Sequence, residues 1–468
     1  MELRMTAEQI LSLGPELADF LDEFYDCFAR SEPRNHLANY IRGQLSDLPR
    51  KSVEPIADFT NTPRRTLQEF LSWSEWDHLA LRDCVQQVVA RDHVDAQAIG
   101  IIDDSGHPKS GTKTACVQVQ WCGNTGQKDN CVVSVHLSYA SYDTRFRAML
   151  DSDLFLPKHG WDDPDRRAEA GIPDHLVYRP KYDIALAQLD RARVNGICFA
   201  WITVDEWYSG CPNFLGGLEA RRQRYVAEIR RSFPAWSCDP RSKTQASYRE
   251  VETLCRYSHF MMTQEWQKVY IKVTENGPMV WEFKCAPIWI HRHGQVLGPY
   301  WLIYTRNVLN SDEEKYFLSN ATPGTPVEPI LHVAFARWSM ERTLEDEKSE
   351  LGMSHFEVRK YDAIMRHLSV TQVSHLFLAR QTKRLRGEKS GDHHLPSPRG
   401  RQCPDRRAPT QSFGSQSTSR QRFAEAHPKS TKEHPSTPIP HANTLGDPQG
   451  TRNQSRRTPL LHSEIDRK

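Results

Sequence analysis

Three acidic residues are spaced so that they could act together. Two short apolar runs end in aspartate: residues 99–102 precede Asp103, and residues 197–204 precede Asp205. Further along, Glu341 stands four residues after Arg337 and seven before Lys348, which places the three on one helix face. Carboxylate oxygens suit Mg²⁺, and two such ions can activate an oxygen nucleophile and stabilise the leaving oxygen of a phosphodiester. The pattern therefore predicts a metal-dependent phosphodiester site.

Each signal alone also has an ordinary structural interpretation. An aspartate after a strand commonly begins a turn or caps a helix, and a helix of alternating charge is commonly a solvated surface. Lys348 could simply pair with Glu345 or Glu341. Two aspartates in this order favour the site, and the apolar neighbours Phe335 and Trp338 indicate a helix packed into a core.

Residues 1–95 should form a helical module. Apolar residues recur at helical spacing in residues 17–24 and 81–89, and Thr66 with Glu69 three residues later predicts the start of another helix. Basic residues lie in the connections, which suits contact with a DNA backbone. An ordinary solvated helical domain remains an equal alternative.

The rest of the chain divides by pattern into four parts. Residues 96–244 alternate strands and helices, and the two aspartate runs have the few polar positions typical of strands buried on both faces. Residues 245–330 read as a β-rich insertion, and residues 331–384 as helical. Residues 385–468 are polar and basic, so they should be disordered. The predicted class is α/β: a mixed sheet flanked by helices.

Net charge, apolar runs and cysteine content indicate which cellular environment the sequence suits. A formal net charge of +2 over 468 residues says little about partners, and no apolar run reaches the length of a membrane span. Eleven cysteines lack any C-x-x-C pair, which suits unpaired thiols in a reducing cytosol and argues against a zinc site.

Five segments carry a family resemblance. The chain resembles insertion-sequence transposases of the DDE class, and within them the insertion sequence 701 family. Arg337, Glu341 and Lys348 match the R-x₃-E-x₆-K part of the family's third motif, although Ala334 stands where the family has tyrosine. The other similar segments are residues 103–109 (DDSGHPK), 111–113 followed by 119–127, 204–210 (VDEWYSG), and 351–359 (LGMSHFEVR) followed by 366–367.

The resemblance implies a fold and a site. The core should be RNase H-like, with Asp103, Asp205 and Glu341 holding two Mg²⁺ ions that Mn²⁺ can replace. Asp104 is the alternative to Asp103, which is preferred because the family's aspartate stands two residues before Ser or Thr. The residues expected to contact DNA are Arg337, Lys348, Lys109 and Lys113.

It also implies an activity: cleavage at the terminal inverted repeats of an element, then strand transfer into target DNA. The expected partner is double-stranded DNA, bound by a homodimer in the bacterial cytoplasm at the nucleoid, with no membrane. In related enzymes tryptophans of the insertion stack on a flipped base, here Trp281, Trp289 or Trp301, although core packing is the ordinary role of each. A tyrosine nucleophile at Tyr208 is disfavoured, because no Arg/His constellation surrounds it.

Two alternatives stay open. One is a catalytically inactive, transposase-derived DNA-binding protein, for which the alanine at position 334 leaves room. The other is a different RNase H-like nuclease, which the β-rich insertion and the arginine–glutamate–lysine helix disfavour.

Overall fold

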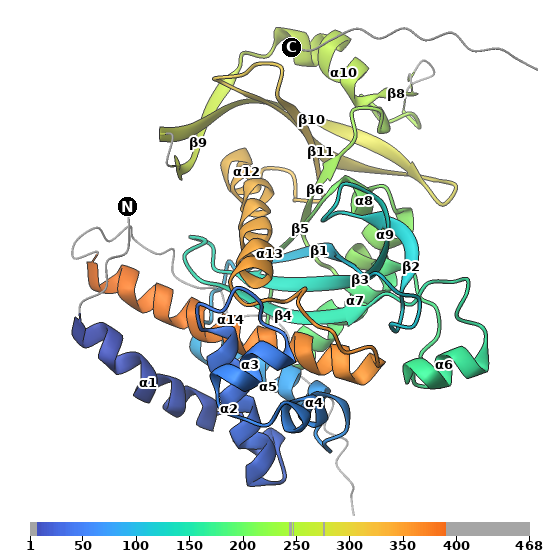
Figure 1. Ribbon diagram of the computed structural model, residues 1–468. Helices are drawn as coiled ribbons and strands as arrows, with labels where there is room; N and C mark the ends of the chain where they lie inside the picture. Colours follow the sequence, from blue (N-terminus) through green and yellow to red (C-terminus); the bar gives the residue numbers. More distant parts are fainter. Residues whose placement is uncertain (1–6, 243–245, 247, 275–276, 390–468) are drawn as a thin grey trace, which may run out of the picture. The chain divides into compact units, whose positions relative to one another are not determined.

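The computed structural model describes residues 7–242, 246, 248–274 and 277–389. The tail predicted from residue 385 lies outside this part, except that the last helix continues to Lys389. Within the described residues, twelve strands form one sheet in the order β2-β3-β1-β5-β6-β12-β11-β10-β7-β8, with β4 beside β3 and β9 beside β10 (Figure 1).

The half of the sheet that carries the aspartates is mixed. β4, β3 and β1 pair antiparallel, whereas β1, β5 and β6 are parallel. With its flanking helices this arrangement is that of an RNase H-like fold, so the predicted class is confirmed. The strands of this half are β1 (Ile99–Pro108), β2 (Gln118–Cys122), β3 (Gln127–Ala140), β4 (Arg147–Leu154), β5 (Trp201–Val204) and β6 (Tyr225–Ile229).

The β-rich segment continues the same sheet. β12 pairs antiparallel with β6, and β11 and β10 follow. The boundaries predicted for a β-rich insertion, residues 245 and 330, stay predictions. Of the strands after β6, β12 is the one that pairs with it, and β12 directly precedes α12 in the chain. The strands are β7 (Pro234–Trp236), β8 (Tyr248–Glu250), β9 (Gln267–Thr274), β10 (Gly277–Arg292), β11 (Gln295–Asn307) and β12 (Glu314–Ser319).

The N-terminal helices pack against the last helix of the chain. α14 (Tyr361–Lys389) contacts α2, α4 and α5 as well as β4, so the first and last helices lie together (Figure 1). The N-terminal elements are α1 (Ala7–Asp22), η1 (Tyr25–Cys27), α2 (Ser31–Gln44), α3 (Val53–Phe59), α4 (Arg64–Ser72) and α5 (His78–Asp92).

Helices cover both faces of the central strands. Along β1, Ile99 and Ile101 belong to the core shared with α12, α13 and α14, whereas Ile102 belongs to the core shared with α5 and α7. The remaining helices are α6 (Pro164–Ala170), α7 (Lys181–Val194), α8 (Glu206–Ser209), α9 (Pro212–Ala220), α10 (Val251–Tyr257), α11 (His259–Thr263), α12 (Val327–Ala336) and α13 (Trp338–Ser349).

Three local predictions were wrong. The apolar run 197–204 is a strand only from Trp201, and β1 does not end before Asp103 but continues to Pro108 because β3 pairs with it throughout. Thr66 does not cap α4, which begins two residues earlier. Pro63, whose fixed φ suits a helix entry, accepts the first helical hydrogen bonds instead.

No helix in the part of the chain that the structure describes is both long and apolar enough to span a membrane.

Candidate active site

Asp103 lies in the middle of a paired strand. Side chains alternate along a strand, so Asp103 points to the same face as Ile99 and Ile101, the face covered by α12 and α13. His136 of β3 stands directly opposite in the antiparallel register. The Asp103 side chain is only 18% exposed, and its Oδ2 lies 3.7 Å from Arg337, which directly precedes the helix that carries Glu341.

Asp205 stands where β5 ends and α8 begins. Its Oδ1 accepts hydrogen bonds from the backbone N–H groups of Trp207 (3.0 Å) and Tyr208 (3.1 Å), as an N-cap does. The predicted structural role of a capping aspartate is therefore real, but only one of its two oxygens is used for it. The side chain of Tyr208 is fully buried, and its hydroxyl lacks a hydrogen-bond partner among the described residues.

The two aspartates influence each other electrostatically. Burial, together with the negative charges of Asp205 and Asp104, raises the pKa of Asp103 to about 7 against the opposing effect of Arg337. Burial also raises the pKa of Asp205. Carboxylates that are buried close together resist ionisation when too little positive charge lies nearby. A divalent cation supplies that positive charge.

Glu341 is brought to this site through Arg337. The turn at Arg337 separates α12 from α13, and Glu341 lies in the first turn of α13. The Arg337 guanidinium is 3.0 Å from Glu341 Oε1 and 3.7 Å from Asp103 Oδ2. Arginine therefore lies between two of the three predicted metal ligands. The Glu341 side chain remains 50% exposed.

A fourth carboxylate, which the sequence prediction missed, also contacts this arginine. Glu228 Oε2 on β6 is 3.6 Å from Arg337 Nε, and Glu228 Oε1 is 2.6 Å from Lys315 Nζ on β12. The available signal was a single glutamate in the otherwise apolar strand Tyr225–Ile229. A charged residue in such a strand needs a partner.

Asp104, the alternative to Asp103, has a different environment. Strand alternation turns it to the other face, where its Oδ2 accepts a 2.6 Å hydrogen bond from Lys181 at the start of α7. This pairing favours Asp103 as the residue that faces α13, in agreement with the preference from the motif.

The predicted DNA-contacting lysines differ in their surroundings. Lys348 is half-buried, and burial lowers its pKa while the charges of Asp103 and Asp104 raise it, so it lies on the carboxylate side of α13. Lys109 donates to the Phe356 carbonyl (2.8 Å), and burial lowers its pKa to about 8. Lys113 forms an exposed ion pair with Glu169 (2.6 Å).

The three tryptophans proposed for base stacking are partly or wholly used in packing. Trp281 is fully buried and packs on Phe335 and Trp338. The Trp301 indole donates to the Thr322 carbonyl. Trp289 is half-buried and pairs with Trp236 between β10 and β7.

The donor set fits a divalent cation chemically, but it is not assembled as a cage. Among the described residues, no group of three or more Asp, Glu, His or Cys side chains is close enough together to hold a metal ion. Asp103 and Asp205 are held by β1 and by the start of α8, and hard oxygen donors suit Mg²⁺. Glu341 would have to leave Arg337 to join them.

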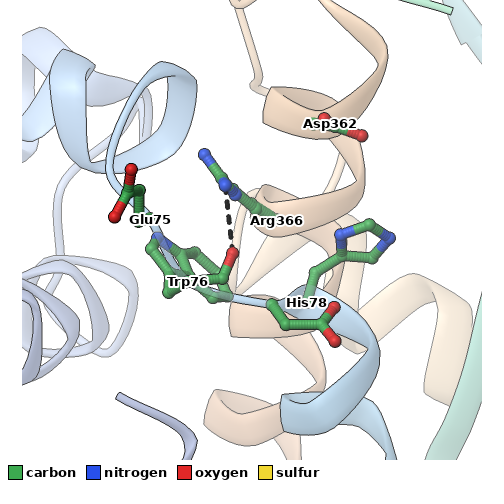
Figure 2. Close-up of a pocket in the computed structure, with 6 residues that line it drawn as sticks. Glu75, Trp76, His78, Asp362 and Arg366 are labelled. Atoms are coloured by element: carbon green, nitrogen blue, oxygen red, sulfur yellow. Dashed lines mark hydrogen bonds between the residues drawn. The ribbon is translucent and has the colours of Figure 1, made fainter. Parts of the chain in front are cut away.

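A separate cavity of about 450 Å³ lies between α14 and the connection from α4 to α5. Figure 2 shows Arg366 of α14 directed at Trp76, whose carbonyl accepts a 3.0 Å hydrogen bond from the guanidinium. Glu75, His78 and Asp362 line the same cavity. These contacts attach α14 to the N-terminal helices and involve none of the site carboxylates.

Comparisons with known proteins identify the family. Residues 23–269 match the family described as DDE superfamily endonuclease. The chain is also 27% identical over 327 residues to the probable transposase for insertion sequence element IS701 of Microchaete diplosiphon, covering 69% of this chain and 76% of that protein. The matched residues include Asp103 and Asp205. The chain belongs to the DDE superfamily endonucleases, where it is similar to transposases of the IS701 type, and the resemblance predicted from its motifs is confirmed.

Proposed function

We propose that this enzyme cuts DNA at the terminal inverted repeats of a mobile element and joins the freed ends to target DNA. The observation that carries the proposal is that Arg337 contacts both Asp103 on β1 and Glu341 on α13, while Asp205 directly follows the parallel strand β5, which pairs with β1. The similarity to an insertion-sequence transposase supports the same substrate class.

Asp103, Asp205 and Glu341 would hold the divalent ions, two Mg²⁺ with Mn²⁺ as a substitute. When bound, such ions lower the pKa of water and stabilise charge on phosphate oxygens. In the first reaction the oxygen of a water molecule bonds to phosphorus while the bond to the 3′ oxygen breaks, which frees a 3′-hydroxyl. In the second, that hydroxyl bonds to a phosphorus of the target and a second 3′ oxygen leaves with a proton.

The basic residues next to the carboxylates would bind the phosphates. Arg337 is planar, permanently charged and able to donate to several oxygens at once. Lys348 lies on the same side of α13, close enough for its charge to act on Asp103. Contacts of this kind fix the register of the DNA strand and carry no base preference. We further propose that a homodimer holds two element ends, in the cytoplasm at the nucleoid.

The test is a cleavage assay on linear DNA that carries the ends of the element encoding this chain, with Mg²⁺ or Mn²⁺. Asp205→Asn should abolish nicking at the repeat boundary while binding to the ends is retained. Asp239→Asn is the matched control, because the Asp239 carboxylate pairs with Arg241, two residues along the chain, and with none of the site residues that the structure describes. Specific binding without cleavage by the unaltered chain under either metal would instead establish a DNA-binding protein that has lost catalysis.

A further inference from the structure

We propose that Glu228 is a positioning residue that keeps Arg337 beside the site when Asp103 and Glu341 release it to bind a divalent cation. The inference rests on the proposed function, because it assumes that these two carboxylates are metal ligands. Through Glu228, strand β6 would contribute to the metal affinity of the enzyme.

Arg337 is shared among three carboxylates from three different elements. Its Nη2 is 3.0 Å from Glu341 on α13, its Nη1 is 3.7 Å from Asp103 on β1, and its Nε is 3.6 Å from Glu228 on β6. Its side chain is 17% exposed. A guanidinium has five N–H donors in one plane, so different edges can serve different carboxylates at the same time.

A divalent cation and this guanidinium compete for the same oxygen atoms. Both are positive, so a cation that binds Asp103 and Glu341 weakens the hold of those carboxylates on Arg337. An arginine that lost all its partners in this half-buried position would be left as an uncompensated charge, which is strongly unfavourable. The free energy of metal binding therefore depends on what else Arg337 can contact.

Glu228 provides the remaining contact. It is not one of the predicted metal ligands, and it is itself held in place, because Lys315 Nζ donates to its Oε1 at 2.6 Å from the adjacent strand β12. Glu228 and Lys315 are 13% and 19% exposed, so solvent screens their charges only partly. With Glu228 present, Arg337 can give up two partners and keep the third.

The consequence is a defined effect of removing the Glu228 charge. In Glu228→Gln, Arg337 would retain Asp103 and Glu341 of its three ion-pair partners, would bind them more tightly, and would resist displacement by a metal ion. The dissociation constant for Mn²⁺ should rise roughly tenfold, which corresponds to about 1.4 kcal/mol. Glu228→Asp keeps the charge but withdraws it by one methylene, so it should give a smaller rise.

The experiment is a titration of the full-length chain with Mn²⁺ alone, in which free Mn²⁺ is followed by electron paramagnetic resonance. No DNA or cleavage is involved. Glu282→Gln is the matched control: Glu282 is a similarly buried glutamate, 17% exposed and paired with Arg306 at 2.8 Å. It loses the same charge without touching Arg337, and its Mn²⁺ affinity should stay within twofold of the unaltered chain. Circular dichroism confirms that each variant is folded.

A double-mutant cycle separates positioning from direct attraction of the metal. If Glu228 acts through Arg337, Glu228→Gln should change Mn²⁺ affinity less than twofold in an Arg337→Gln background. A tenfold effect that persists there would make Glu228 a direct electrostatic or ligand contributor and overturn the inference, as would unchanged affinity in both Glu228 variants. If the unaltered chain binds no Mn²⁺ at all, the proposed metal site itself fails.

Discussion

Replacing Asp103 with asparagine should make the metal-free protein more stable at alkaline pH, although it removes a predicted metal ligand. The folded chain raises the pKa of Asp103 from 3.8 to about 7, chiefly through burial. Its charged form is therefore disfavoured by about 4 kcal/mol relative to the unfolded chain. Asparagine has nearly the same shape and never carries that charge.

The direction of the pH effect on stability follows from how many protons the folded and unfolded chains bind. Between pH 4 and pH 7 the folded chain holds the Asp103 proton and the unfolded chain does not, so the stability of the unaltered protein falls as pH rises. Below pH 4 both states are protonated, and the difference from the variant disappears. The advantage of Asp103→Asn should therefore grow by ~2–3 kcal/mol between pH 5 and pH 8.

Urea unfolding of both proteins at pH 5, 6, 7 and 8 with a chelator measures this difference. Asp104→Asn is the control at the neighbouring position: it breaks the half-buried pair with Lys181 and should destabilise by about 1–2 kcal/mol at pH 8. The two adjacent substitutions thus have opposite signs. A difference between Asp103→Asn and the unaltered chain that does not change with pH would refute the electrostatic description of the site.

Three further predictions concern the surroundings of the site. Burial raises the pKa of Glu347 to about 8, and its side chain is 1% exposed. Glu347→Gln should therefore raise the urea midpoint of unfolding at pH 8 and leave it unchanged at pH 4. An equal change in the midpoint at both pH values would contradict this. Trp281→Ala should cost ~3–5 kcal/mol in urea unfolding, as for a large core side chain, whereas a loss below about 1 kcal/mol would favour a role outside the core. Gly106→Ala places a Cβ 2.6 Å from the Cys122 sulfur and should cost ~1–3 kcal/mol; adding Cys122→Ala should restore part of this, and no recovery would show that the sulfur is not the obstacle.

The sequence was sufficient for the parts of the site that depend on local periodicity. Helical spacing predicts that Arg337 and Glu341 lie on one helix face, and their 3.0 Å contact confirms this. The capping potential of Asp205 was also visible from its place after an apolar run. In each case the relevant partners are within a few residues, so local geometry decides.

Contacts between distant elements could not be predicted in this way. That β12 pairs with β6, and so brings Lys315 to Glu228, depends on which strand edge remains available once β1, β5 and β6 have paired. Arg337 was expected to contact DNA, and its position against Asp103 depends on how α12 and α13 pack over the sheet. The strand predicted for the apolar run 197–204 was too long at its start, because apolar residues also occupy the connection after α7, where Gly196 adopts a positive φ.

The three predicted ligands differ in how firmly the fold holds them. Asp103 is in a strand with neighbours on both sides, and Asp205 is tied to the first amides of α8. Glu341, by contrast, is half exposed, and its charged partner is an arginine just before the same helix. Assembly of the proposed metal site would thus leave the backbone at the two aspartates in place, while Asp103 and Glu341 exchange Arg337 for the metal. Because Arg337 would take part in that exchange, we expect groups that contact Arg337 to influence metal affinity, and Glu228 on β6, which lies outside the motif, is such a group.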